Sequence, residues 1–443
     1  MRLTTCISCM KETNICWGND YQQMPRYAGN FFTLDSFDLR GRHIYLRLDV
    51  NSPINPIDGN IMSSARFESH LETLRDLSES MVVLVAHQSR PGKNDFTSLN
   101  RHAEKLERIL GRPVEFIDSL FGKEVRNRIR KMEPGDIIML ENTRFYSEEV
   151  DIDAGDIDAV ESTHIVRNLV DLFDYFVIDA FPAIHRAQTS LVGFRRLKPN
   201  LAGRLIEREV SMIDRFRDSR ERPKIAILAG AKIDDSIQVS SNFLRDGTVD
   251  SILVGGVVAN AFLWASGFDI GRKNREFIEK NNKDHKKLIE TCSKLLKSYP
   301  GKIIMPEDFV LNPMGRLFSI NDHIPDDQLI ADIGLESIAR FSSLISEARG
   351  IFLNGPMGMY EIEEYSVGTR EILEAVANSD ALTIAGGGHT LSALEKLNLM
   401  GRITHASTGG GALISYLSGD PMPVLESLVE SRKIFGVKED GKQ

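Results

Sequence analysis

The feature that most constrains the fold is a regular alternation of short apolar runs with longer helical patterns. The runs are nearly continuously apolar and many are β-branched, as expected of strands that a sheet buries on both faces. They are HIYLRLDV (43–50), MVVLVAH (81–87), VEFID (114–118), DIIMLEN (136–142), FVIDAF (176–181), KIAILAG (224–230), SILVGG (251–256), KIIMP (302–306), GIFLNGP (350–356), ALTIAGG (381–387) and ITHAST (403–408). Strand, helix and strand in repetition predict α/β architecture, with parallel sheets covered by helices.

Eleven strands in 443 residues are more than a single twisted open sheet usually contains. We therefore expect two doubly wound parallel-sheet, Rossmann-like domains that face each other across a hinged cleft. The boundary is predicted near Lys198–Ile206, after which LAGRLIEREVSMIDRF (201–216) is typical of a long helix that enters the second domain. The predicted parts are an N-terminal extension (1–30), an N-terminal domain (31–200), a C-terminal domain (201–416) and a C-terminal segment (417–443).

Composition excludes several classes of protein. The chain is 42% apolar and 26% charged, which is ordinary for a globular protein, and its net charge of −9 argues against nucleic acid or anionic membrane as a partner. No apolar run approaches the roughly 20 residues that cross a bilayer. Because the N-terminus lacks the apolar core of a signal peptide, we expect a cytoplasmic protein.

The first two dozen residues differ from the rest, with no strand or helix period and three of the four cysteines. The pair Cys6-x-x-Cys9 could be half of a zinc site, but it lacks a second such pair or a close histidine pair. We favour a disordered tail, or an upstream stretch absent from the natural product because translation starts at Met24. The alternative is a redox or metal-binding arm.

Polar and cationic side chains follow the strands of the first half, at the edge where open parallel sheets bind ligands. They are Asp49, Asn51, Arg66, His87, Arg90, Asn142, Arg144, Asp179, His185 and Arg186. Guanidinium groups grip carboxylates and phosphates with two parallel hydrogen bonds. The pattern therefore favours a site for a small, multiply charged anion over a set of surface salt bridges to the 63 acidic residues.

Glycines follow the strands of the second half: Gly230, Gly255-Gly256, Gly355, Gly386–Gly388 and Gly409–Gly411. Such strand-to-helix turns suit nucleotide phosphates, yet none has the GxxxxGK[ST] or GxGxxG spacing. Lys232 is placed to reach a transferred phosphoryl group, unless it is a solvated lysine at a helix start. An anion half and a nucleotide half together indicate phosphoryl transfer, which needs positioning, charge neutralisation and exclusion of water.

Eight segments, in this order along the chain, resemble those of phosphoglycerate kinases. They are RLDVNSP (47–53), AHQSRP (86–91), ENTRF (141–145), DAFPAIHRAQTS (179–190), GAKIDDS (230–236), NGPMGMYE (354–361), GGGHT (386–390) and STGGGA (407–412). The resemblance runs from about Phe31 to the C-terminus, and GFDIGRKN (267–274) with GGGHT is similar to the archaeal branch.

The resemblance implies a phosphotransferase of glycolysis and gluconeogenesis with a carboxyl group as acceptor. Its reaction would be reversible transfer between 1,3-bisphosphoglycerate and ADP, giving 3-phosphoglycerate and ATP, by direct in-line transfer on domain closure with Mg²⁺. The implied partners are these small molecules alone, with no nucleic acid or membrane, and the implied state is a monomer, with a dimer as the alternative. The segment after about Leu417 would return to the N-terminal domain.

Matched position by position, the resemblance also implies site residues. Those for 3-phosphoglycerate are Asp49, Asn51, Arg66, His87, Arg90, Arg144 and Arg186. Those for the nucleotide are Gly230, Lys232, Gly255, Asn354, Pro356, Glu361, Gly386, Gly387, Gly388, His389 and Thr390, with Glu361 at the ribose. The implied catalytic groups are Arg66, Lys232, Gly387 and Gly410; the metal ligands are left unknown.

Two departures from the family pattern concern the nucleotide side. Ser236 stands where many members have a second lysine, and His389 where many have an aspartate tied to Mg²⁺. Neutral histidine is a poor ligand for Mg²⁺, so we expect the metal to bind through ATP oxygens and water, with Asp235 as an outer acid. His389 either donates to a phosphate when protonated or caps a helix.

Smaller departures are Gln88-Ser89, Pro182-Ala183 and Gln188, which concern the fine geometry of the anion site. Two other functions stay open from the residues alone. One is a nucleotide- or phosphate-binding protein that has lost turnover, and the other is a different two-domain ATP-dependent enzyme that acts on a small carboxylic acid.

Overall fold

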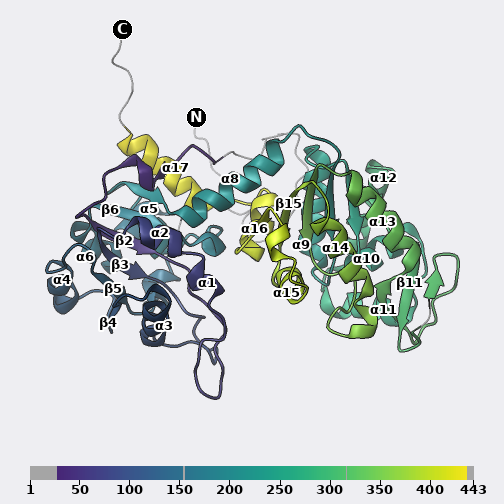
Figure 1. The fold of residues 1–443 in the computed structure, drawn as a ribbon, viewed down its shortest axis with the longest axis horizontal. Coiled ribbons are helices and arrows are strands. Elements are labelled where there is room, and N and C mark those ends of the chain that lie inside the picture. The colour runs from purple at the N-terminus through teal and green to yellow at the C-terminus, as the bar shows by residue number, and fades with distance from the viewer. Residues whose placement is uncertain (1–26, 153–154, 316, 437–443) are drawn as a thin grey trace, which may run out of the picture.

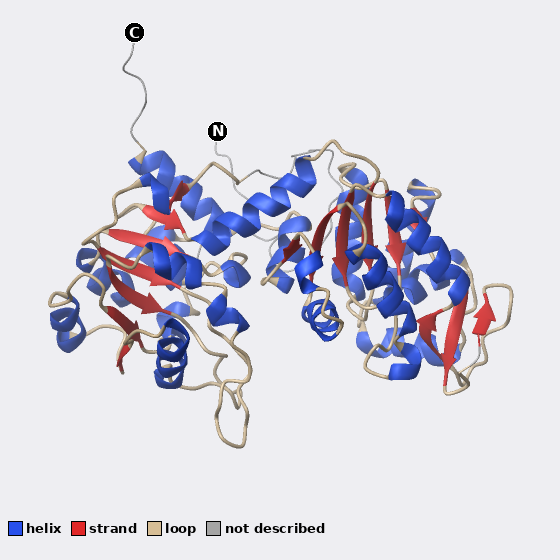
Figure 2. Cartoon of the chain, in the orientation of Figure 1, coloured by secondary structure: helices blue, strands red, loops and turns tan. Residues whose placement is uncertain are grey.

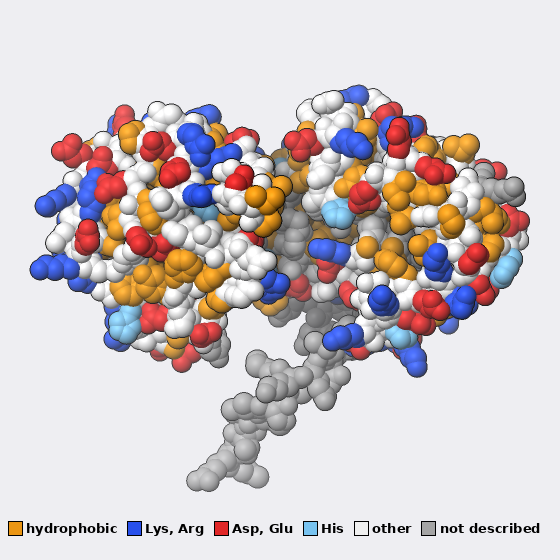
Figure 3. Space-filling model, turned by 90° about the horizontal axis from the view of Figure 1, so that it is seen from below, with side chains coloured by type: hydrophobic (Ala, Val, Ile, Leu, Met, Phe, Trp, Pro, Cys, Tyr) orange, Lys and Arg blue, Asp and Glu red, His pale blue; other side chains and the backbone are white. Residues whose placement is uncertain are grey.

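The computed structural model describes residues 27–152, 155–315 and 317–436, which form two lobes that each contain a parallel sheet (Figure 1). Seen from below, the space-filling surface is indented between the lobes (Figure 3). The cysteines at positions 6, 9 and 16 lie outside the described residues, as do residues 437–443 of the predicted C-terminal segment. Among the described residues, no helix is both long enough and apolar enough to cross a bilayer.

The first lobe contains a seven-stranded sheet in the order β1-β7-β6-β2-β3-β5-β4, with every pair parallel. Its strands are β1 Phe32–Thr33, β2 His43–Arg47, β3 Met81–Val85, β4 Glu115–Ile117, β5 Ile137–Leu140, β6 Tyr175–Ile178 and β7 Asn200–Ala202. Each of the five predicted runs contains a strand. The strands end before the runs do, because the last residues of each run turn into the loops at the carboxyl edge.

Two strands of this sheet were not predicted. Strand β7 lies inside the segment that we expected to be a connection, and it pairs with β1 and β6. Two or three residues are too few to show a period of two, so only pairing with distant strands reveals them as strands.

Helices cover both faces of the first sheet (Figure 2). They are α1 Ala65–Glu68, α2 Leu71–Asp76, α3 Asn100–Leu110, α4 Lys123–Ile129, α5 Ile157–Glu161, α6 His164–Leu169 and α7 Thr189–Val192. Within β2, Ile44 and Leu46 pack with α1 to α3, whereas Tyr45 packs on the other face with α4 and α6. Burial on both faces explains the continuous apolar runs.

The second lobe contains a six-stranded parallel sheet in the order β10-β9-β8-β14-β15-β16. Its strands are β8 Lys224–Leu228, β9 Ser251–Val254, β10 Ile303–Ile304, β14 Gly350–Asn354, β15 Leu382–Gly386 and β16 His405–Ala406. A separate antiparallel sheet, which we did not predict, consists of β11 Asp308–Asn312, β12 Leu317–Ser319 and β13 Leu329–Ile333. Helices again cover both faces of the six-stranded sheet.

The helices from residue 204 onward are α8 Arg204–Asp218, α9 Ile233–Arg245, α10 Gly256–Ser266, α11 Arg272–Asn281, α12 His285–Ser298, α13 Leu335–Glu347, α14 Val367–Ala377, α15 Gly388–Lys396, α16 Gly410–Leu417 and α17 Pro423–Phe435. Single 3₁₀ turns occur at η1 Leu34–Ser36, η2 Thr143–Phe145, η3 Ser147–Glu149, η4 Val170–Leu172, η5 Phe181–Ala183, η6 Glu363–Tyr365 and η7 Met400–Arg402.

Helix α8 joins the two lobes, in agreement with the predicted long helix, and α16 lies between them (Figure 1). At its start the backbone N–H of Leu205 donates to Asp179 of the first lobe (2.9 Å). Further along, buried Glu209 accepts from His405 Nε2 (2.7 Å) and Thr408 N (2.7 Å) of the second lobe. Because α8 is bonded to both lobes, it connects the carboxyl edge of the first sheet with the loop that begins α16.

Both ends of the described chain are packed against other elements: the N-terminal end lies against α8, and the C-terminal helix α17 lies on the first lobe. Tyr27, assigned above to the N-terminal extension, is buried, and its backbone N–H donates to Asp214 of α8 (3.2 Å). The organised chain therefore begins by Tyr27, and the expected limit at residue 30 was wrong. At the other end, α17 packs on the first lobe, where Ser431 Oγ accepts from Asn200 N of β7 (2.8 Å).

Candidate functional site

Asp49 lies just beyond β2 and is buried at the carboxyl edge of the first sheet. Its carboxylate accepts from the guanidinium of Arg66 and from the backbone N–H of Asn51 (3.0 Å). Burial acts to raise the pKa of Asp49, but the charge of Arg66, the hydrogen bond from Asn51 N–H and the charge of Arg47 together outweigh burial and hold the pKa below its usual value. Asp49 is thus an ionised group that orients Arg66.

Arg47, the last residue of β2, is fully buried and was not among the predicted site residues. Its Nε donates to Ser190 Oγ (2.8 Å), and its Nη2 lies 3.0 Å from His87 Nδ1. Buried Glu149 lies 3.9 Å away and accepts from Ser190 Oγ (2.6 Å). Burial and then the charge of Arg47 hold the pKa of His87 well below its usual value, so His87 is neutral.

Arg144 follows β5 and donates to the carbonyl of Ser89. Burial, then the positive charges of Arg186 and Arg47, lower the pKa of Arg144 to about 10. Burial is also the largest cause of the lowered pKa of Arg186, to which Arg47, Arg66 and Arg90 contribute. The cations therefore repel one another, and a bound anion would relieve that repulsion.

Several polar atoms of this cluster are buried without a hydrogen-bond partner among the described residues. They are His87 Nε2, Arg144 Nε, His185 Nδ1 and Gln188 Oε1. Buried polar atoms are rarely left unpaired unless a ligand or water meets them. Gln188 Oε1 can only accept a hydrogen bond, but the nitrogens of His87 and Arg144, together with the excess of cations, indicate that this edge of the sheet binds an anion.

Two predicted strand-end residues have other partners. Asp179 accepts from His70 Nδ1 (2.8 Å) and Thr73 Oγ1 (2.8 Å), and it also caps α8. Asn142 Oδ1 accepts from the backbone N–H of Arg144 (3.1 Å). Both therefore support the loops of the site.

In the second lobe the predicted glycine turns come together at the carboxyl edge of the six-stranded sheet. A Cβ on Gly387, whose φ is +86°, would lie 2.5 Å from Asn354 Oδ1. The backbone N–H of Gly355 donates to Thr390 Oγ1 (2.7 Å), and a Cβ on Gly230 would lie 3.2 Å from Pro356 Cδ. The turns after β8, β14 and β15 thus pack closely against one another.

The STGGGA segment joins these turns to the first lobe. A Cβ on Gly410 would lie 3.4 Å from Gly387 Cα, and one on Gly409 would lie 2.5 Å from the Phe181 ring of the first lobe. Helices α15 and α16 begin at Gly388 and Gly410, so their N-termini lie close together. Helix N-termini present unpaired N–H groups, which favour phosphate oxygens.

Charged side chains around the glycine turns are exposed. Lys232 is exposed at the N-cap of α9, while His389 Nδ1 lies 3.8 Å from Glu361 Oε1 with both side chains mostly exposed. The N-cap of α15 is Gly387 and His389 lies inside the helix, so the helix-cap role considered for His389 was wrong. No three metal-binding side chains cluster anywhere in the described part of the chain.

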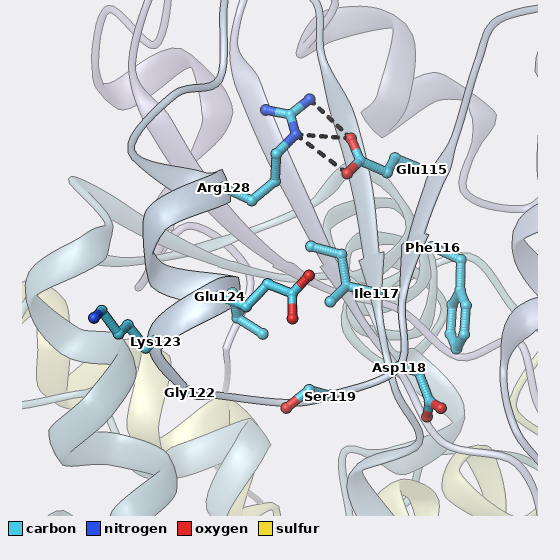
Figure 4. A pocket seen from close by; sticks show the side chains of 10 residues that line it. Glu115, Phe116, Ile117, Asp118, Ser119, Gly122, Lys123, Glu124 and Arg128 are labelled. Carbon is cyan, nitrogen blue, oxygen red and sulfur yellow. Dashed lines mark hydrogen bonds and ion pairs between the residues drawn. The ribbon is translucent and has the colours of Figure 1, made fainter.

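A groove at the border of the first sheet is separate from this site (Figure 4). It lies between the edge strand β4 and α4. In it Arg128 Nη2 pairs with Glu115 (2.8 Å) and Asp136 (3.2 Å), so its principal cation is already neutralised. The groove therefore offers no excess of positive charge.

Comparisons with known proteins agree with this arrangement. The family model for phosphoglycerate kinase matches residues 34–420. The chain belongs to the phosphoglycerate kinase family. It is 64% identical to the phosphoglycerate kinase of Thermoplasma acidophilum over 405 residues, 91% of this chain and 99% of that protein. Identity to the phosphoglycerate kinase of Methanothermus fervidus is 44% over 406 residues, 91% of this chain and 98% of that protein.

Solved structures agree as well. Phosphoglycerate kinase from Pyrococcus horikoshii OT3 aligns with a TM-score of 0.83 at 39% identity, covering 91% of this chain and all of that one. The enzyme from Coxiella burnetii aligns with a TM-score of 0.74 at 29% identity, covering 90% of this chain and 98% of that one. The predicted two-lobed α/β fold and the resemblance to archaeal members are thereby confirmed.

Members of the phosphoglycerate kinase family are phosphotransferases with a carboxyl acceptor that use ATP or ADP with Mg²⁺. Sequence reasoning overlooked Arg47, Glu149, Ser190 and His70 near the site. A charged residue inside an apolar run was the available signal for Arg47. The other three act through partners far along the chain, which no local pattern shows.

Proposed function

We propose that this chain transfers a phosphoryl group reversibly between 1,3-bisphosphoglycerate and ADP, giving 3-phosphoglycerate and ATP. The observation that carries the proposal is the cluster of guanidiniums and unpaired buried N–H groups around Asp49, on the lobe that α8 connects to the glycine turns. A site with excess positive charge and a cradle of backbone N–H groups are the two halves of a phosphotransferase.

The acceptor half would bind 3-phosphoglycerate through Asp49, Asn51, Arg66, His87, Arg90, Arg144 and Arg186. Five guanidiniums, counting Arg47, meet two carboxylates, Asp49 and Glu149, so the surplus of positive charge suits an acid that carries both a phosphate and a carboxylate. Arg66 is oriented by Asp49 and is only partly buried, which leaves it able to reach the group in transfer.

The donor half would bind the nucleotide at Gly230, Lys232, Gly255, Asn354, Pro356, Glu361, Gly386, Gly387, Gly388, His389 and Thr390. At Gly388 nothing lies within 4 Å of the place that a Cβ would take, so the backbone there is open to the approach of a phosphate. Mg²⁺ would be held through nucleotide oxygens and water and would supply charge neutralisation, with Asp235 in the first turn of α9 as the acid proposed to hold that water.

Residues 27–200 with 417–443 are proposed as the acceptor domain, and residues 201–416 as the nucleotide domain. Closure of the two on α8 would bring Arg66 and Gly410 to the group in transfer, permit in-line displacement and exclude water. Lys232 and the N–H groups of Gly387 and Gly410 would stabilise the transferring charge. We further propose a cytoplasmic monomer.

The test is a coupled assay with 3-phosphoglycerate and MgATP on chains that start at Met1 and at Met24, with ADP formation as the signal. Acceptor-dependent turnover by both chains is expected. Turnover by the Met1 chain alone would give the extension a role in catalysis.

Glycerate serves as the matched acceptor that lacks the phosphate. Equal turnover with glycerate would contradict the acceptor assignment and favour another kinase of small carboxylic acids. Bound nucleotide without turnover would instead favour a binding protein, since Ser236 and His389 replace a lysine and an aspartate of many relatives.

A further inference from the structure

Arg47 and His87 meet inside the first lobe in a way that fixes where the imidazole protons lie. Arg47 Nη2 is 3.0 Å from His87 Nδ1, and both side chains are buried. Arginine carries only donors and keeps its proton in proteins, so the nitrogen that faces it must be an acceptor. Nδ1 of His87 therefore has a free lone pair.

The position of Arg47 is itself well defined. Its Nε donates to Ser190 Oγ (2.8 Å) and its Nη1 donates to the carbonyl of Leu48. Ser190 is held in turn by Glu149, through Oγ (2.6 Å) and the backbone N–H (2.9 Å). Because Nε and Nη1 are both held by these hydrogen bonds, the guanidinium cannot rotate, and its Nη2 stays directed at His87 Nδ1.

We propose that Arg47 is a positioning residue that holds His87 as the neutral tautomer with its proton on Nε2, so that His87 presents an N–H donor to the bound acid. Nε2 is buried and lacks a hydrogen-bond partner among the described residues. Because buried polar atoms are rarely left unpaired, an N–H at Nε2 is expected to donate to an oxygen of the ligand. His87 then binds a carboxylate or phosphate oxygen and cannot serve as a general base.

The charges that face His87 support the neutral form. Arg47 on β2, Arg144 after β5 and Arg186 after β6 disfavour a second proton, whereas Asp49 after β2 favours one. Glu149 is the other acid nearby, and it lies 3.9 Å from the Arg47 nitrogen that meets His87. Burial, the largest cause, acts in the same direction as the arginines and lowers the pKa of His87. A second proton would also set an N–H of His87 against an N–H of Arg47.

The inference rests on the acceptor site proposed above, but its test needs no acceptor. ¹⁵N NMR of histidine-labelled, ligand-free protein distinguishes a protonated from an unprotonated ring nitrogen, and the signal of His87 is assigned by its loss in His87→Gln. We expect unprotonated Nδ1 and protonated Nε2, without titration between about pH 5.5 and 8. A protonated Nδ1, or titration in that range, would overturn the proposal.

Arg47→Gln tests the cause, because glutamine can donate or accept and carries no charge. His87 is expected to titrate or to populate both tautomers in this variant, and unchanged nitrogen shifts would refute the role of Arg47. Because Arg47→Gln leaves Glu149 without its buried cation, Arg47→Gln/Glu149→Gln is the second variant, with the same expected result.

Binding of 3-phosphoglycerate to the same proteins then separates the two proposals. His87→Met should weaken binding roughly ten- to hundred-fold, the usual effect of losing a hydrogen bond to a charged group. His87→Gln keeps an N–H near the position of Nε2 and should lose less. Equal losses in the two variants would contradict the donor role, whereas no binding to the unaltered protein would refute the acceptor site and leave the tautomer result standing.

Discussion

Gly387 offers a sharp test of the proposed phosphate cradle, because an alanine there meets two obstacles. Its φ is +86°, and left-handed backbone costs a residue with a Cβ about 1–2 kcal/mol. The new Cβ would also lie 2.5 Å from Asn354 Oδ1, so the side chain of Asn354 must leave its rotamer, at a cost of about 1 kcal/mol. The turn after β15 is therefore disfavoured by about 2–3 kcal/mol in its present shape.

The assay is kcat/KM for ATP at saturating 3-phosphoglycerate, together with the midpoint of thermal unfolding. At 1.4 kcal/mol for each factor of ten, Gly387→Ala should lower kcat/KM roughly 30- to 140-fold if the turn must be rebuilt to receive phosphate. The unfolding midpoint should fall as well, unless the turn relaxes.

Two other glycines provide the controls. Gly401→Ala adds the same methyl group where nothing lies within 4 Å of a Cβ and φ is ordinary, so both readouts should stay near those of the unaltered protein. Gly388→Ala adds a methyl beside Gly387 without strain and should leave the unfolding midpoint unchanged. If Gly387→Ala matched Gly401→Ala in both readouts, the reasoning about this turn would be refuted.

Three further predictions concern other parts of the molecule. Arg66→Ala should lower kcat far more than it weakens ATP binding, because Arg66 lies in the acceptor half; weaker ATP binding with unchanged kcat would contradict that placement. Tyr27→Ala should lower the free energy of unfolding by about 3 kcal/mol, since the ring is buried against Tyr416, and denaturant titration showing no change would exclude Tyr27 from the core. Burial raises the pKa of Asp332 to about 7, so the native state binds the extra proton and stability should fall as pH rises from about 4 to 7. Asp332→Asn should flatten that slope, and an unchanged slope in denaturant titrations would show that another group is responsible.

Much of the fold follows from patterns that are local in sequence. Each of the eleven predicted runs contains a strand because burial on both faces of a sheet demands uninterrupted apolar residues, as in KIAILAG and β8. The residues after each strand also end up together, since parallel strands share one carboxyl edge. For this reason Asp49, His87, Arg144 and Arg186 could be named as neighbours before any coordinates were known.

Other elements are short or antiparallel and left no such pattern. Strands β1 and β7 hold two and three residues, and they exist as strands because they pair with each other and with β6. The three-stranded antiparallel sheet likewise depends on pairing across β11 to β13. Hydrogen bonds between strands are not local in sequence, so periodicity alone could not find them.

By itself the sequence determined the alternation of the longer strands with helices and the family. It also showed that arginines follow the strands of the first half and glycines those of the second. Only the tertiary structure decided how individual polar groups are used. The local pattern predicts only that Arg47 belongs to a strand, yet its side chain contacts His87, 40 residues away. Likewise Glu209 has the pattern of an exposed helix residue, yet it is buried against His405, 196 residues away. Apolar burial repeats with the period of an element and can be read locally, whereas a buried charge depends on the one distant partner that stabilises it.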